Sequence, residues 1–311
     1  MKKFEIMKNT KISRGGNIHL FSNLKGIFLL CCFLLPGLSL MAQEDEQPPA
    51  DKPVRATFNS AWLIDNQSVM VPIKGTLEFD ILHRFGTIGN GYEDLFGFYA
   101  SSNMKMGFTY APINNLSVGF GLTKRKHLLD FNAKYALLKQ MKSGSIPVSV
   151  TYYGNMAIDT RKQKAREEVY HSSDRYSYFH QLIVARKFSP ALSLQLAGSL
   201  SHYNIIDEGM KHDHYAISAG GKIKITETLN GIFNIDQPIT KHTVNNPNPN
   251  ISLGIEVATS AHAFQIFIGN YSAIIPQENN MFNRNNYNPD EGESFGDNVL
   301  IGFNITRLWN Y

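Results

Sequence analysis

The sequence contains almost no cysteine, with Cys31 and Cys32 as the only two in 311 residues. Both lie in the apolar run Ile27–Leu40, and neither follows the small residues that a lipoprotein signal requires. Removal of this run would leave a chain without thiols or disulfides, whose stability must come from strand pairing and packing. The run is also shorter than the ~20 residues of a membrane-spanning helix, and Pro36 interrupts it. No later stretch of useful length has the period of a helix, so the sequence excludes a bundle of membrane-spanning helices.

A large charge of one sign is missing as well. Residues 1–42 hold six of the 30 basic residues and one of the 26 acidic residues, so the remainder carries 24 basic and 25 acidic side chains. The isoelectric point of about 8.8 therefore belongs mostly to the N-terminal segment. Because the remaining chain is nearly neutral, we expect no basic surface for nucleic acid.

The N-terminal segment is typical of a secretory signal peptide. Six basic residues precede the apolar run, and the small residue Ala42 follows it. The next stretch, Gln43–Lys52, is polar and proline-containing, which predicts a disordered leader. We therefore predict a signal peptide at residues 1–42, a periplasmic leader and lead-in at 43–73, and a transmembrane β-barrel at 74–311.

From Lys74 onward, segments of about ten residues alternate apolar and polar side chains and are separated by turns, as β-strands do. The last segment, Asn298–Tyr311, alternates to the final residue and ends on an aromatic side chain. A soluble sandwich could end in a similar strand, but an exposed aromatic edge invites aggregation, whereas a barrel needs a strand that closes against the first one. The alternation is blurred only near Tyr176–Phe188. We predict that Phe303, Trp309 and Tyr311 form the signal that the barrel-assembly machinery reads.

The predicted connections alternate in length. Tight links follow the even-numbered strands, and long polar links follow most odd-numbered strands, with Lys124–Lys126 as the short exception. This sorting is typical of an outer-membrane barrel and has no counterpart in a soluble sandwich. The sequence therefore predicts an all-β fold: a transmembrane, antiparallel, up-and-down β-barrel of about twelve strands in the outer membrane of a Gram-negative bacterium. An even strand number places both termini in the periplasm and the outer face against membrane lipid.

Five short motifs occur in order along the predicted barrel: Lys74-Gly75, His83-Arg84-Phe85-Gly86, Asn115-Leu116-Ser117-Val118-Gly119, Ala185-Arg186-Lys187-Phe188 and Gly302-Phe303-Asn304-Ile305-Thr306-Arg307. Together they resemble a porin-like outer-membrane β-barrel family of Bacteroidota that is defined as a domain of unknown function. The likeness extends over residues 56–311. It implies barrel architecture and outer-membrane residence, and it carries no substrate, activity or functional residues.

The side chains that are expected to point into the lumen carry charges of both signs. Such charges favour a narrow path for small polar solutes. The alternative is an interior closed by ion pairs, because a lumen of about twelve strands is only somewhat wider than that of an eight-stranded barrel. Glycines on this face leave room for a path and suit sheet curvature equally well. The predicted lumen-lining and solute-binding residues are Glu78, Asp80, Arg84, Lys105, Asp130, Lys134, Lys222, Lys224 and Glu256.

Metal and cofactor sites are not predicted. The pair His212-x-His214 places two imidazoles on one face of a strand, but a metal site needs further ligands at fixed geometry. The acidic stretch Asp290–Asp297 lacks the spaced oxygen ligands of a calcium site.

An enzyme is not predicted either. Ser201 and His202 are adjacent in a strand and so point to opposite faces, and Ser173 with His171 lacks a third member. We therefore predict a porin-like transport channel. The second hypothesis is a non-conducting barrel that docks partners through its long loops, and the third is an outer-membrane hydrolase.

Overall fold

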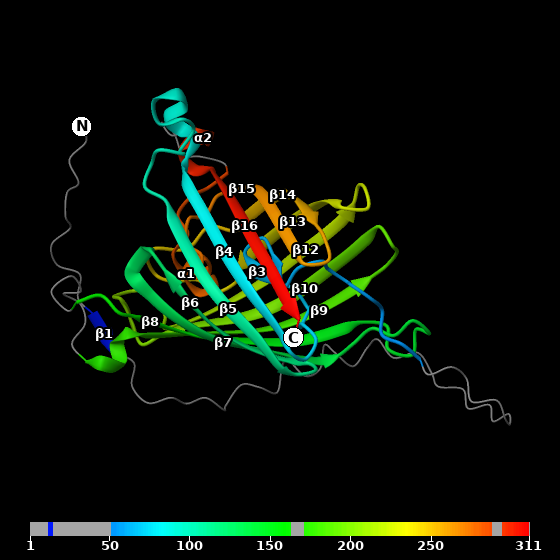
Figure 1. The fold of residues 1–311 in the computed structure, drawn as a ribbon. Helices are drawn as coiled ribbons and strands as arrows, with labels where there is room; N and C mark the ends of the chain where they lie inside the picture. The colour runs from blue at the N-terminus through cyan, green and yellow to red at the C-terminus, as the bar shows by residue number, and fades with distance from the viewer. Residues whose placement is uncertain (1–11, 15–50, 163–170, 288–293, 311) are drawn as a thin grey trace, which may run out of the picture.

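Twelve long strands form one closed antiparallel barrel (Figure 1). The computed structural model describes residues 12–14, 51–162, 171–287 and 294–310. Sequence neighbours pair around the barrel, and the last strand pairs with the first, for example Thr306 with Asp80. The predicted fold class is confirmed. The strands are β4 (Thr76–Thr87), β5 (Asn103–Ile113), β6 (Leu116–Thr123), β7 (Leu128–Leu138), β8 (Ser149–Asp159), β9 (Tyr176–Lys187), β10 (Leu192–Tyr203), β12 (Asp213–Lys224), β13 (Leu229–Pro238), β14 (Asn250–Ala258), β15 (His262–Gly269) and β16 (Leu300–Asn310).

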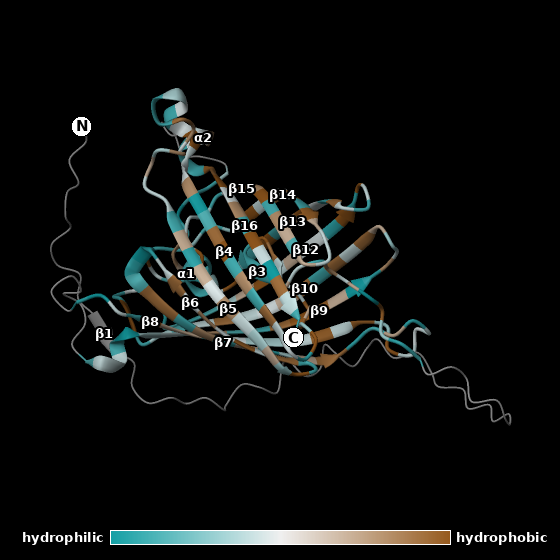
Figure 2. Cartoon of the chain, in the orientation of Figure 1, coloured by the Kyte–Doolittle hydropathy of each residue, from teal (hydrophilic) through white to brown (hydrophobic). Residues whose placement is uncertain are grey.

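Side chains alternate between the two faces of the barrel wall, and Figure 2 shows the resulting bands of brown and teal along the strands. On β16, Phe303 and Ile305 lie on the outer face, while Asn304 and Thr306 point inward and are buried. Outer faces elsewhere carry exposed large apolar groups such as Leu253, 61% exposed. This pattern is that of a wall with lipid outside and polar groups inside.

The connections separate by length onto two rims, as predicted. One rim carries the short turns, including residues 114–115, 188–191 and 225–228, and we call it the short-turn rim. The other carries the longer links, including 88–102 and 270–299, and we call it the long-loop rim. β8 begins at Ser149, two residues after Pro147, which has no N–H to donate to a strand ladder. The C-terminal end of β16 and the start of β4 lie together on the short-turn rim.

The segment before the barrel differs from the predicted periplasmic lead-in. Residues 57–70 fold back into the lumen as a small hairpin, with β2 (Trp62–Leu63) paired to β3 (Asn66–Gln67). We call Thr57–Met70 the lumen hairpin. Its side chains include Leu63 and Ile64, which are 1% and 0% exposed.

The blurred alternation of the sixth barrel strand has a physical cause in this hairpin. On β9, the inward positions include Phe179 and Ile183, both 0% exposed. Both side chains belong to the same buried apolar cluster as the side chains of the lumen hairpin, so at these two positions the inner face of β9 is as apolar as its outer face. A sequence pattern therefore cannot separate the two faces there.

Short helices and strands lie in the links of the long-loop rim. None of the helices among the described residues is long and apolar enough to cross a membrane. β11 (Ile205–Asp207) pairs with β1 (Ile12–Arg14), which lies inside the predicted signal peptide. The helices are η2 (Ile88–Asp94), η3 (Arg125–His127), η5 (Ser172–Arg175), α1 (Pro276–Phe282) and α2 (Phe295–Asn298).

Candidate functional site

The lumen is the candidate site, and the lumen hairpin enters it from the short-turn rim. Before the hairpin, the Val54 N–H donates to Gln140 O at 2.7 Å, beside the β7–β8 turn. The carboxylate of Asp51 accepts hydrogen bonds from Ser143 and Ser145 of the same turn, and these bonds lower the pKa of Asp51. After the hairpin, the Gly75 N–H donates to Ala111 O, close to the β5–β6 turn. Both ends of the hairpin are therefore fixed at one rim.

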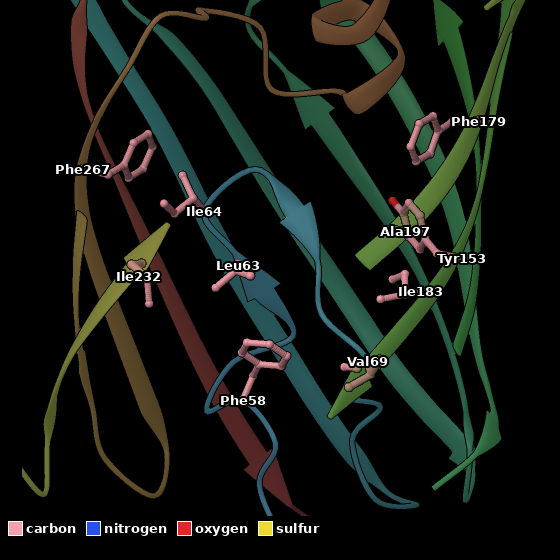
Figure 3. Close-up of a cluster of buried hydrophobic side chains, with 11 residues drawn as sticks. Phe58, Leu63, Ile64, Val69, Tyr153, Phe179, Ile183, Ala197, Ile232 and Phe267 are labelled. Carbon is pink, nitrogen blue, oxygen red and sulfur yellow. The ribbon is translucent and has the colours of Figure 1, made fainter. Parts of the chain in front are cut away.

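One side of the lumen hairpin is apolar and packs against an apolar part of the wall. Figure 3 shows the hairpin side chains in the middle of the barrel, with wall side chains on two sides of them. Burial of each such large side chain contributes roughly 1.5–3 kcal/mol. The hairpin members of this cluster are Phe58, Leu63, Ile64 and Val69, and the wall members are Tyr153, Phe179, Ile183, Ala185, Ala197, Ile232 and Phe267.

The other side of the hairpin faces strands β4 to β7, where the wall is charged. A cavity of about 10 Å³ remains between the two, with Glu78 and Asp80 of the wall among its lining groups and Trp62 on the hairpin side. This volume holds about one water molecule. On the neighbouring strand, a side chain at Gly107 would collide with the carboxylate of Asp80, since an added Cβ would lie 2.5 Å from it. The small residue keeps space beside the acidic groups, and this cavity is too small for a solute larger than water.

Eight of the nine predicted lumen charges are buried, and four of these, Arg84, Lys134, Lys222 and Glu256, bind the inserted hairpin. Lys134 Nζ donates to the carbonyl oxygens of Ala61 and Met70 at 3.2 and 2.8 Å. Lys222 Nζ donates to Asn59 Oδ1 at 3.0 Å, and the Asn59 amide donates to Glu256 at 3.0 Å. The hairpin thus takes the place that a solute would occupy.

Three other predicted charges contact groups of the wall or the rim. Lys105 Nζ lies 3.0 Å from Asp130 Oδ2, an ion pair between neighbouring parts of the wall with both side chains at most 2% exposed. Lys224 differs from the rest, because it lies at the short-turn rim and pairs with exposed Glu227 at 2.6 Å. Among the described residues, Lys105 and Asp130 form the one ion pair between two of the predicted charges, whereas Arg84 pairs with Asp65 of the inserted hairpin.

A second segment enters from the opposite rim. Helix α1, in the long link between β15 and β16, places Gln277, Asn279 and Asn280 inside the barrel at 3% exposure or less. The Gln277 amide donates to Asn155 Oδ1 at 2.7 Å. Glu278 Oε1 forms an ion pair with Lys126 Nζ of η3, at 2.6 Å, on the long-loop rim. Polar contacts with the wall and the rim therefore hold this part of α1, while Phe282 at its end packs edge-on against Tyr203 of β10 with ring centroids 5.0 Å apart.

The two inserted segments meet at Asp65, in the turn of the hairpin. One carboxylate oxygen lies 3.2 Å from Nη2 of Arg84 on β4, and the other accepts the Asn279 amide of α1 at 2.5 Å. The Asp65 side chain is 3% exposed. Trp62 of the hairpin also packs with Ile274, just before α1. A single carboxylate thus joins the wall and both inserted segments.

Sequence reasoning missed the inserted residues, including Asn59, Asp65 and Asn66 of the hairpin and Asn279 of α1. One signal was present: residues 58–73 contain Phe58, Trp62-Leu63-Ile64 and Val69-Met70-Val71. That apolar content is too high for a leader in water and requires a buried partner. For α1 we find no comparable local signal.

The predicted assembly residues lie on or near the outer face. Phe303 stacks on His83 with ring centroids 5.0 Å apart, and Arg307 lies over the ring of Trp309 at 4.9 Å. Tyr311 lies outside the described residues. The role of these aromatic residues in assembly stays a prediction.

The residues considered for metal binding do not come together in the structure. His212 and His214 do not share a site: His212 Nδ1 bonds to Tyr203 O at 2.6 Å, whereas His214 Nδ1 lies 3.1 Å from His242 Nε2. Within the described ranges, no three His, Cys, Asp or Glu residues are grouped to hold a metal ion. Of the acidic loop, residues 290–293 lie outside the described residues.

The serine–histidine candidates also lack a catalytic arrangement. Ser201 is 0% exposed and points inward, while His202 points outward and bonds to Asp213 at 2.7 Å. The backbone N–H of His171 donates to Asp174 at 2.9 Å, in the cap of η5. These contacts are those of strand and loop structure.

A family model described as "Membrane bound beta barrel domain (DUF5777)" matches residues 58–309. The chain belongs to this family. The match begins at Phe58, so the lumen hairpin is part of the family domain together with all twelve strands. No curated protein matches the chain.

Solved structures of other membrane barrels are similar to this fold. The KdgM porin is 7% identical, with a TM-score of 0.42 over 76% of this chain and 99% of that one. The COG4313 outer membrane channel from Pseudomonas putida F1 is 9% identical, with a TM-score of 0.46 over 77% of this chain and 97% of that one. LpxR from Salmonella typhimurium is 10% identical, with a TM-score of 0.34 over 75% and 99%. The family description and the closed ring of twelve strands agree that this chain is a membrane-bound β-barrel.

Proposed function

We propose that the protein is a gated outer-membrane channel for small polar solutes, with the lumen hairpin closing it in the conformation described above. In this proposal residues 1–42 are a signal peptide, the short-turn rim faces the periplasm, and the long loops face the cell exterior. Outer-membrane barrels place short turns and long loops in this way.

One observation supports the proposal most directly: inserted segments, rather than side chains of the wall, fill the lumen. A twelve-stranded wall encloses more space than its own side chains fill. Outside the barrel ladder, the lumen hairpin has only a two-residue pairing of its own, so it can move without breaking the wall. Its withdrawal would leave Glu78, Asp80 and Lys134 facing a water-filled path, as charged side chains do in selective channels.

A non-conducting barrel is the second candidate, and the same filling of the lumen favours it. In that case the hairpin would be a permanent interior, and the long loops would carry the function by docking partners. The two candidates differ in whether the hairpin ever leaves.

A reversible disulfide between the hairpin and the wall would distinguish a gated channel from a non-conducting barrel. A Cβ added at Gly220 of β12 would lie 2.6 Å from Leu63 Cδ2, so Leu63→Cys with Gly220→Cys places two thiols side by side across hairpin and wall. Both native cysteines lie in the predicted signal peptide, so processed protein from outer membranes would carry no other thiol. We expect conductance steps in planar bilayers from the parent and from the reduced double variant, and silence after oxidation, because a disulfide holds the hairpin in the lumen.

Two controls keep this test decisive. Each single cysteine variant should conduct equally with and without oxidant, since neither can form the bridge. A variant in which Ser60–Val69 is replaced by a short glycine–serine linker should conduct continuously. If that variant folds, as shown by heat-modifiable migration in gels, and still passes no current, the barrel is not a channel and the docking hypothesis stands.

A further inference from the structure

The turn of the lumen hairpin is strained and held in place by the wall. Ile64 has φ of 58°, a strained conformation that β-branched residues rarely adopt. Both backbone groups of Ile64 are bound by wall amides: its N–H donates to Gln265 Oε1 at 3.2 Å, and its carbonyl accepts from Asn304 Nδ2 at 2.6 Å. The turn therefore persists only while its contacts hold it.

Next to this strained residue, Asp65 makes contacts that span the whole lumen. Its carboxylate pairs with Arg84, whose guanidinium is 0% exposed and also donates to Asn304 Oδ1 at 2.9 Å. The same carboxylate accepts the Asn279 amide from α1. Breaking a buried ion pair by removing one partner is strongly destabilising, because the other charge is left without compensation.

We propose that the lumen hairpin and α1 form one two-part gate, latched at Asp65. The proposal rests on the proposed channel function and adds to it that the two rims are coupled. The hairpin is reached from the short-turn rim and α1 from the long-loop rim, and they meet at the Asp65–Asn279 bond and at the packing of Trp62 on Ile274. Release of one segment removes contacts that hold the other, so an event on one side of the membrane loosens the gate on the other side. Such coupling is reciprocal.

The coupling is measured by the reactivity of single cysteines in the processed protein, reconstituted in lipid. A cysteine at Asn280 reports on α1, and one at Val69 reports on the hairpin; the native side chains are 3% and 5% exposed. With a hydrophilic maleimide, both should react slowly in the otherwise unchanged chain. Asp65→Asn should raise the labelling rate of the cysteine at 280 at least tenfold, because Asn279 loses its carboxylate partner and the hairpin turn loses Arg84.

The reverse experiment starts from α1. Asn279→Leu removes the amide donor but leaves the Asp65–Arg84 pair, and it should still speed the labelling of the cysteine at 69 severalfold. Asp130→Asn is the matched control. It breaks an equally buried carboxylate–cation pair, with Lys105 at 3.0 Å, and Asp130 bonds directly to the wall residues Asn132 and Asn155. Because it reaches α1 only through Asn155, which accepts the Gln277 amide, its effect on either cysteine should stay well below that of Asp65→Asn.

The outcomes separate the latch from the channel. If Asp65→Asn speeds labelling at both 69 and 280 but no variant conducts, the result supports the latch and contradicts the proposed channel function. Faster labelling at 69 alone shows that the segments move independently and overturns the latch. Equal acceleration by Asp130→Asn shows general loosening of the barrel and also overturns it.

Discussion

At the scale of single residues, four of the predicted lumen charges act as binding groups for an internal segment. Lys134 shows this best, because the residue is 3% exposed and its ammonium group donates to two hairpin carbonyl oxygens. Hydrogen bonds from a charged group contribute roughly 1.5–3 kcal/mol each. The sequence assigned this charge to a solute path, and in the structure it binds two backbone oxygens of the hairpin.

Charge reversal at this position should therefore loosen the hairpin. We expect Lys134→Glu to lower the free energy of unfolding by at least about 3 kcal/mol, since the new carboxylate faces two carbonyl oxygens that repel it. Thermal unfolding in detergent measures the loss. Lys224→Glu is the control, because Lys224 at the rim pairs with an exposed partner and should change stability by less than about 1 kcal/mol. Unchanged stability of Lys134→Glu, together with an altered reversal potential, would show instead that Lys134 lines an open path.

At the scale of elements, the long-loop rim contains a pair of histidines that joins a loop to the barrel. His242, in the loop between β13 and β14, accepts the Lys211 N–H at Nδ1 (2.9 Å) and faces His214 through Nε2 (3.1 Å). Burial, followed by the positive charges of Lys211 and Arg284, lowers the pKa of His242. A neutral ring can accept the Lys211 N–H, and a protonated ring cannot.

Acidification should release this loop. Because the folded-state pKa of His242 lies below the unfolded value of ~6.5, the group stabilises the loop above that pH, and the contribution is lost as the pH falls through the folded pKa. Hydrogen exchange at the Lys211 amide, corrected for its intrinsic pH dependence, should rise severalfold between pH 7.5 and pH 5. In His242→Gln the corrected rate should not vary with pH. A pH effect that survives this substitution would assign the titration to another group.

At the scale of the whole molecule, the barrel has two unlike rims and one inserted segment from each. Both ends of the lumen hairpin and the end of β16 lie at the short-turn rim, while α1 descends from the long-loop rim. The orientation of the barrel in the membrane therefore decides which compartment reaches which half of the gate.

The proposed orientation predicts where epitopes are accessible. A tag inserted after Tyr92, which is 85% exposed in the link between β4 and β5, should be labelled by antibody on intact cells. A tag in the turn at Ser189–Pro190 should be labelled only after the outer membrane is permeabilised, because short turns face the periplasm. Both insertions leave the strands and the hairpin untouched. The opposite labelling pattern would invert the barrel and exchange the compartments that reach the hairpin and α1.

The sequence by itself determined the wall of this barrel. A strand between lipid and an aqueous or polar interior must alternate apolar and polar side chains, and the links of an outer-membrane barrel differ in length between the two rims. Both features can therefore be recognised in short stretches of the sequence. For the same reason the inward positions of Glu78, Asp80 and Lys134 were predictable, because parity along a strand fixes the face of each side chain.

Only the tertiary structure decided what fills the lumen. The contacts of the hairpin join residues far apart in the chain: Asn66 bonds to Asn234, 168 positions away, and Ile64 to Gln265, 201 positions away. No local period encodes such pairings, because they depend on closure of all twelve strands around the segment. The apolar content of residues 58–73 and the blurred face of β9 were their local traces. The β9 trace was ambiguous because an inner face that joins the apolar cluster of the hairpin resembles an outer face that meets lipid.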